Sequence, residues 1–213
     1  MKKGIFYALI TAIMFVTLEP VSKLISNDIS PFAMTFWRFL IGSLMLIPFA
    51  IVKIKKEQIK ITGKDVLLMA LLGILVICIS MLSLQFAVKL ADAPSLIAII
   101  FSVNSVLTII FALLFISEEK FTKNKIIALV LGIIGVVVCA DFSSGTNLGS
   151  VALALIAAVS FSLYTALSRK YAKKISGLIQ SAGGSLIGSI VLLYDFGFSL
   201  FVQDNFHYPL SEC

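Results

Sequence analysis

Charged residues are scarce in this chain of 213 residues. Aspartate, glutamate, lysine and arginine together account for 13% of it, against roughly 25% in typical soluble domains. Hydrophobic residues account for 60%, and the mean hydropathy is +1.09. This composition excludes an ordinary soluble domain and predicts a protein whose helices lie in a bilayer.

Residues that support catalysis are also missing. The single histidine, His207, lies in a polar tail, so a paired-histidine zinc motif cannot form and a serine–histidine arrangement within the membrane is not expected. The sequence contains no G-x-S-x-G elbow and no phosphate-binding P-loop. Cys78, Cys139 and Cys213 show no suggestive spacing for a disulfide or a zinc site. We therefore expect no enzyme activity, no metal and no cofactor.

Long apolar runs are present instead. A bilayer core of roughly 30 Å is spanned by about 20 helical residues. Seven runs approach this length, at residues 4–25, 32–52, 66–88, 94–116, 126–141, 148–168 and 178–196. The alternation that a β-barrel needs is absent. We therefore predict an all-α polytopic membrane protein with about seven transmembrane helices, the first of them retained rather than cleaved as a signal peptide.

The basic residues alternate between the connections of these helices. Fourteen of the seventeen fall in one set of connections: Lys2, Lys3, Lys53, Lys55, Lys56, Lys60, Lys64, Lys120, Lys123, Lys125, Arg169, Lys170, Lys173 and Lys174. The other set holds only Lys23 and Lys89. The positive-inside rule then places the N-terminus in the cytoplasm of a multi-pass protein of the cell (plasma or inner) membrane. The net charge of +6 therefore reflects orientation and contact with lipid, not a nucleic-acid partner.

An internal repeat divides the chain. A shift of 146 positions superposes twelve identical residues in a window of 36, including ALI at Ala8–Ile10 and LIGS at Leu40–Ser43. Because five predicted spans separate the copies, they start on opposite sides of the membrane. We therefore predict an inverted repeat, which is typical of transporters.

Several motifs resemble the EamA-type domains of the drug/metabolite transporter superfamily. They are Pro20 with Ser22-Lys23, Ile29–Pro31, Trp37-Arg38, Ala91–Ile100, Leu114–Thr122 and Ile126–Val138. The resemblance implies a first five-helix unit at residues 4–141, a second unit represented by two helices at 148–202, and a polar tail at 203–213. Asn104 stands where such families usually carry a proline in the fourth helix. The family pattern also implies ten helices, three more than we count.

Polar residues inside the predicted spans are the candidate site. Glu19 and Arg38 lie at matching depths on sequential helices, roughly 9–10 Å below the outer surface, so we predict an ion pair facing the bundle interior. A substrate- or proton-coupled role and a permanent structural pair are the two interpretations. Gln85 and Asn104 extend this polar seam, either towards a substrate or as hydrogen bonds between helices. Trp37 is a candidate cavity wall or an interfacial residue.

These observations favour a secondary transporter that exports a small metabolite or drug-like compound by alternating access. One alternative is a truncated, inactive or partner-dependent fragment, with helices supplied by another chain or by a homodimer. A seven-helix receptor is a further alternative, which the predicted cytoplasmic N-terminus argues against. We expect a small-molecule substrate and the lipid bilayer as partners. The small-residue spacing Gly184-xxx-Gly188 predicts close helix packing.

Overall fold

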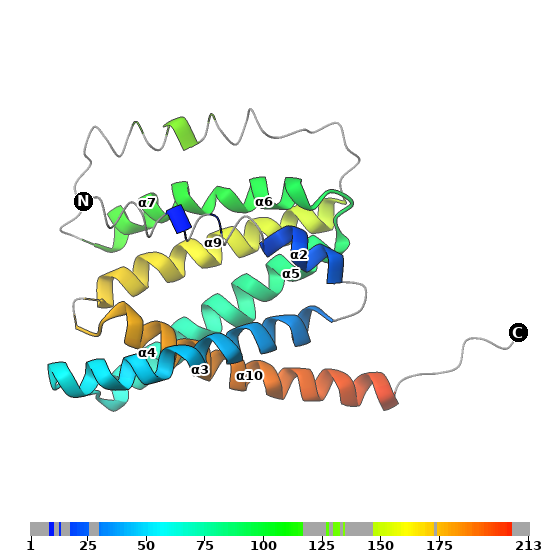
Figure 1. The fold of residues 1–213 in the computed structure, drawn as a ribbon. Helices are drawn as coiled ribbons and strands as arrows, with labels where there is room; N and C mark the ends of the chain where they lie inside the picture. Colours follow the sequence, from blue (N-terminus) through cyan, green and yellow to red (C-terminus); the bar gives the residue numbers. More distant parts are fainter. Residues whose placement is uncertain are drawn as a thin grey trace, which may run out of the picture.

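The structure is a computed structural model that describes residues 9–10, 13, 18–25, 30–116, 127, 130–132, 134, 147–172 and 174–205. Every regular element in these ranges is a helix. The helices are α2 (Leu18–Ile25), α3 (Pro31–Glu57), α4 (Gly63–Gly73), η1 (Ile74–Met81), α5 (Leu82–Leu90), α6 (Pro94–Ser102), α7 (Asn104–Phe115), α9 (Leu148–Tyr171) and α10 (Gly177–Asn205) (Figure 1).

Five helical stretches are long and apolar enough to cross a membrane. They are Pro31–Glu57, Gly63–Leu90, Ser95–Phe115, Leu148–Tyr171 and Gly177–Tyr194. Each coincides with one of the seven predicted spans, so the all-α polytopic membrane fold is confirmed. Half of the predicted span at 4–25 and most of the span at 126–141 fall outside the described residues, and α2 forms the end of the first.

Local sequence explains where the helices begin and end. Ser30 caps α3, its hydroxyl accepting from the backbone N–H of Ala33 at 3.2 Å, and Pro31 supplies the first helical residue. At the other end Gln58 adopts a left-handed conformation with φ of 49°. Asn147 caps α9 in the same way as Ser30, through the N–H of Gly149 at 2.9 Å.

Two of the spans are irregular in a way that periodicity did not predict. Between α4 and α5 the backbone passes through the π-helical segment η1, and such segments in other proteins are frequent at functional sites. The fourth span is interrupted at Val103, between α6 and α7, where the N–H of Val103 bonds Ile100 O at 3.2 Å. The break therefore occurs without a proline, at the position where we noted Asn104.

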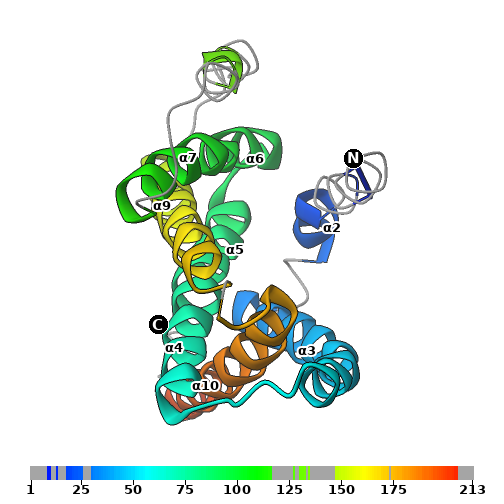
Figure 2. The ribbon, with the colours of Figure 1, turned by 90° about the vertical axis from the view of Figure 1, so that its left-hand side faces the viewer.

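The two helices of the second repeat copy, α9 and α10, pack against helices of the first copy. α3 lies along α10 and runs antiparallel to it, while the continuous rod of α4, η1 and α5 contacts both α9 and α10 (Figure 1). α6 and α7 cover another side of α9 (Figure 2). One end of the bundle gathers the end of α3, the start of α4, the end of α9 and the start of α10, at the left of Figure 1. We call this the lysine-rich end.

A main core and a smaller one hold these helices together. The main core joins α3, η1, α5, α6, α9 and α10 around fully buried Ile77, Leu84 and Ile97. Alanines 154, 157 and 158 of α9 are also fully buried there, which brings this helix close to the rod. The smaller core lies towards the lysine-rich end and contains Ala50, Met69, Ile175, Ile179 and Ala182.

Glycines let α10 cross the rod with the two backbones in contact. A Cβ placed on Gly73 would lie 2.2 Å from the carbonyl oxygen of Gly184. One placed on Gly188 would lie 2.7 Å from Ile77 Cδ1 and 3.0 Å from Gly73 O. The predicted role of Gly184-xxx-Gly188 in close packing is therefore confirmed, with Gly73 as its partner.

The repeat is visible in the helix boundaries. A shift of 146 positions carries Ile25, the end of α2, onto Tyr171, the end of α9. The same shift carries Pro31, the start of α3, onto Gly177, the start of α10. The equivalent helices α3 and α10 are in contact and run in opposite directions, which is the geometry that an inverted repeat requires.

Candidate functional site

Among the predicted site residues whose side chains the structure describes, Gln85 is the most buried. It is 5% exposed on α5, and its side-chain amide donates to the hydroxyl of Ser22 on α2 at 3.4 Å. Lys23, the next residue, donates from Nζ to the carbonyl oxygens of Val88, Lys89 and Ala91 at 3.2, 3.2 and 2.6 Å. A cation on the last carbonyls of α5 satisfies groups that have no partner within the helix. These contacts fix the end of α2 on α5.

The predicted ion pair concerns the same region. The backbone of Glu19 lies on α2, one turn before Ser22, but its side chain is outside the described part of the structure. Arg38 on α3 is half-buried, and its guanidinium carbon lies 5.5 Å from the centre of the Phe39 ring, within the range of a cation–π contact. The pairing of Glu19 with Arg38 stays a prediction.

Trp37 is the most exposed of the predicted site residues whose side chains are described. Its side chain is 57% exposed and meets the ring of Phe36 edge-on, with 5.3 Å between centroids. This exposure fits an aromatic residue facing lipid or the interface better than a wall enclosed within the bundle.

Asn104 lies at the break between α6 and α7, and is half-buried. Its backbone carbonyl accepts from the hydroxyl of Ser162 on α9 at 2.9 Å, and that hydroxyl also bonds Ala158 O at 2.6 Å. Neighbouring helices commonly satisfy backbone groups at irregular points of a membrane span in this way. The side-chain amide of Asn104 is engaged only weakly, by Ser105 Oγ at 3.4 Å.

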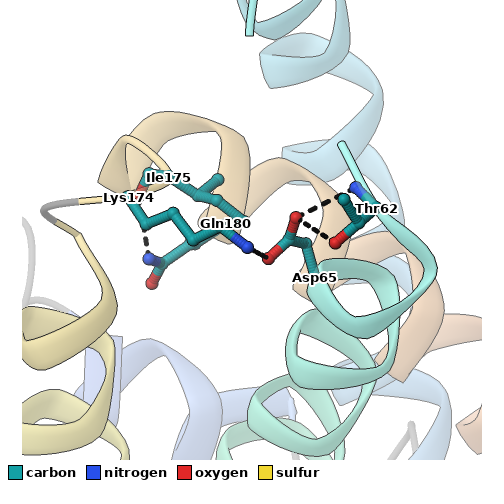
Figure 3. Close-up of polar contacts among 5 residues, drawn as sticks. All are labelled: Thr62, Asp65, Lys174, Ile175 and Gln180. Atoms are coloured by element: carbon teal, nitrogen blue, oxygen red, sulfur yellow. Dashed lines mark hydrogen bonds and ion pairs between the residues drawn. The ribbon is translucent and has the colours of Figure 1, made fainter. Parts of the chain in front are cut away.

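A polar cluster at the lysine-rich end was missed at the sequence level (Figure 3). Asp65, buried in the first turn of α4, accepts at 2.5 Å from Lys174 in the connection between α9 and α10. The same carboxylate accepts from the backbone N–H and hydroxyl of Thr62 at 2.9 and 2.6 Å. The Thr62-x-x-Asp65 spacing is a capping-box signal that would have located the aspartate. Its partner Lys174 is 109 positions away and no local pattern predicts it.

Gln180 extends this cluster into α10. It is 3% exposed, and its side-chain amide donates to Ile175 O at 2.8 Å (Figure 3). Its side-chain oxygen accepts from the hydroxyl of Ser168 on α9 at 2.7 Å. These bonds tie the end of α9 to the start of α10 on either side of Lys174. The connection that carries Lys174 is therefore held at both ends.

No group of three or more histidine, cysteine, aspartate or glutamate side chains among the described residues is arranged to hold a metal ion. The polar contacts instead join helices of the two repeat copies: Asp65 to Lys174, Asn104 to Ser162, and Ser80 Oγ to Ala157 O at 2.8 Å.

The model of the EamA-like transporter family matches residues 2–140. This chain belongs to the EamA-like transporter family. It is 37% identical over 202 residues to an uncharacterized transporter of Clostridium kluyveri, an alignment that covers 91% of this chain and 64% of the relative. An uncharacterized transporter of Archaeoglobus fulgidus is 24% identical over 90% of this chain and 66% of its own length. The uncharacterized transporter YvbV of Bacillus subtilis is 33% identical, in an alignment that covers 82% of this chain and 56% of the relative.

The chain thus spans about two thirds or less of the length of these EamA-like relatives. No solved structure matches it. Family membership and the names of the relatives point to a transporter rather than an enzyme. The polytopic helices place the protein in a membrane.

Proposed function

We propose that this EamA-like protein carries a small organic solute across the cell membrane by alternating access. The observation that carries the proposal is the antiparallel packing of the repeat-equivalent helices α3 and α10 against one another. Two inverted units in contact have two nearly equivalent arrangements, one open to each side of the membrane. Export of a metabolite or drug-like compound is the direction we favour.

The contact between Asp65 and Lys174 supports a specific conformation. It joins the first unit to the second at the lysine-rich end, 2.5 Å from atom to atom. We propose that this end is closed in the structure and opens when the ion pair separates. A permanent structural pair would instead stay closed throughout the transport cycle.

Distance measurements between spin labels test this mechanism. Labels replace exposed Lys64 on α4 and exposed Lys170 on α9, in a chain whose three cysteines are changed to serine. We expect two distance populations, and Asp65→Asn should enrich the longer one. A single population that Asp65→Asn leaves unchanged contradicts alternating access at this end.

Transport itself is tested in proteoliposomes with a panel of labelled amino acids, nucleobases and organic cations. We expect saturable flux of at least one class above that of protein-free vesicles. Arg38→Gln should reduce this flux if Arg38 lines the path, whereas Lys89→Gln, at the opposite end from the lysine-rich end, serves as the control. Flux equal to that of empty vesicles for every class would count against the proposal.

Proton coupling through Glu19 is the finer hypothesis. A carboxylate inside the membrane is costly unless paired or functional, which motivates the assignment. Glu19→Gln should remove the dependence of flux on pH. Unchanged pH dependence in this variant rejects the coupling role but leaves transport intact.

We also propose that the lysine-rich end faces the cytoplasm. The described basic residues of that end are Lys53, Lys55, Lys56, Lys60, Lys64, Arg169, Lys170 and Lys174. Only Lys23 and Lys89 lie at the other end among the described residues, so the positive-inside rule sets the direction. A cysteine at exposed Lys60 should resist a membrane-impermeant thiol reagent in intact cells, and one at exposed Asp92 should react. The reverse result inverts the topology.

A further inference from the structure

Four lysines of the lysine-rich end have no acidic partner in the described structure, and they share one short stretch of chain. They are Lys55, Lys56, Lys60 and Lys64, at the end of α3, in the connection and at the start of α4, and all four are exposed. We call these four residues the lysine surface. We propose that the lysine surface binds the headgroups of anionic phospholipids in the leaflet that it faces.

The acidic residues nearby are already engaged. Glu57 lies 3.8 Å from Lys53, one turn earlier on α3. Asp65 is buried against Lys174 and Thr62. No acidic residue between Lys53 and Asp65 therefore neutralises the positive charge of the lysine surface. An anionic ligand is the chemical complement of such a surface.

The position of the surface along α3 matches the headgroup layer. α3 has 27 residues, so it is about 40 Å long, whereas the hydrocarbon core needs only about 30 Å. Its sequence is uncharged from Leu40 to Val52, and lysines begin at Lys53. The last turns of α3 therefore leave the hydrocarbon, and the lysine surface lies where the lipid phosphates are. A soluble anion or an acidic protein would not explain this depth.

Backbone hydrogen bonds and packing hold the connection that carries the lysine surface in a defined conformation. Gln58 turns the chain out of α3 in a left-handed conformation, and the N–H of Ile59 bonds Ile54 O at 3.2 Å. Ile59 then packs against the smaller core, and the capping box of Thr62 and Asp65 starts α4. Because this geometry exists before a lipid binds, little conformational freedom is lost on binding.

The test uses the whole chain in detergent micelles, with phosphatidylglycerol or phosphatidylcholine added and the unfolding temperature followed. We expect phosphatidylglycerol to raise the unfolding temperature more than phosphatidylcholine does. Each change of a lysine to glutamine should weaken the binding of phosphatidylglycerol by on the order of fivefold. The quadruple change of the lysine surface to glutamine should abolish the preference, and added salt should weaken it. The quadruple change to arginine, which keeps the charge, should retain it.

Two controls make the outcome decisive. Lys89→Gln, an exposed lysine at the other end of the bundle, should leave the preference unchanged. Glycerol phosphate, a soluble compound with the same phosphate chemistry, should give no rise. An equal preference in the quadruple glutamine variant overturns the proposal, as does a rise with glycerol phosphate as large as that with the lipid. Where the quadruple variant does not fold, the single variants carry the same test. Transport is not needed for any arm, so failure here leaves the transport proposal standing.

Discussion

The two copies of the repeat share two helix boundaries, Ile25 with Tyr171 and Pro31 with Gly177, but use equivalent positions differently. Trp37 and Arg38 of α3 correspond to Gly183 and Gly184 of α10, while Gly42 corresponds to Gly188. In α10 the glycines lie close to the rod backbone, since a Cβ added at Gly188 would lie 3.0 Å from Gly73 O. In α3, a Cβ added at Gly42 meets no atom within 4 Å, and Trp37 is 57% exposed.

This comparison separates what the repeat conserves from what packing demands. The first helix of each copy ends, and the second begins, at equivalent positions, because nearby sequence shared by the copies sets these two boundaries. The need for glycine depends on which helix crosses that position, and only α10 crosses the rod at Gly73 among the described residues. Identical glycines in the two copies therefore carry different energetic weight.

The largest expected effect comes from Gly73→Ala. The added methyl would lie 2.2 Å from Gly184 O, a backbone atom that cannot move without separating α10 from the rod. We expect a loss of about 3 kcal/mol or more in the free energy of unfolding, at the upper end of overpacking effects. Reversible unfolding in micelles measures it. A stable Gly73→Ala protein would show that the two helices do not cross here.

The repeat-equivalent pair Gly188→Ala and Gly42→Ala sharpens the comparison directly. At Gly188 the methyl would approach Ile77 Cδ1 at 2.7 Å, a side-chain end that can give way in part. We expect a destabilisation of about 1–3 kcal/mol. Gly42→Ala should be neutral or slightly stabilising, because alanine favours the helix and the space is open. Equal effects at the two positions would contradict the structure.

Separating the units at the lysine-rich end should give a smaller effect, seen in local opening rather than in global unfolding. Asp65→Asn removes the charge that Lys174 meets but keeps a group able to bond Thr62. We expect faster hydrogen exchange in the connection between α9 and α10. Lys170→Gln, on an exposed residue of the same region, is the control. Hydrogen exchange that is equally fast in both variants would show that the ion pair of Asp65 and Lys174 does not hold the connection closed.

The smallest expected effect compares two fully buried serines. Ser80 on η1 donates across to Ala157 O of α9, whereas Ser43 donates to Leu40 O of its own helix. Ser80→Ala should cost about 0.6 kcal/mol, the average for a hydrogen bond between membrane helices. Ser43→Ala should cost less, because it removes no contact between helices. The same unfolding assay, with each variant measured against the unchanged chain, tests the order.

The sequence alone determined that the helices lie in a lipid bilayer, approximately where they span it, and that the chain contains a repeat. Apolar runs near 20 residues identify membrane helices because the bilayer imposes that length, and five of the predicted spans were confirmed where the structure describes them. The predicted Gly184-xxx-Gly188 contact was also confirmed, since small residues at this spacing serve few other purposes in a membrane. Candidate site residues were identifiable as polar groups in apolar runs, and the pairing of Glu19 with Arg38 stays a prediction.

Only the tertiary structure decided which helices meet. Hydrophobic periodicity does not encode the π-helical segment or the break at Val103, and the partner of Asp65 lies 109 positions away in the sequence. Trp37 and Gln85 show what the sequence could not distinguish. Both side chains carry a polar N–H group within an apolar span, yet Trp37 is exposed and Gln85 is buried against α2. Sequence specifies which residues can enter a membrane. Contacts between helices, set by shape and backbone approach, specify what each of them does there.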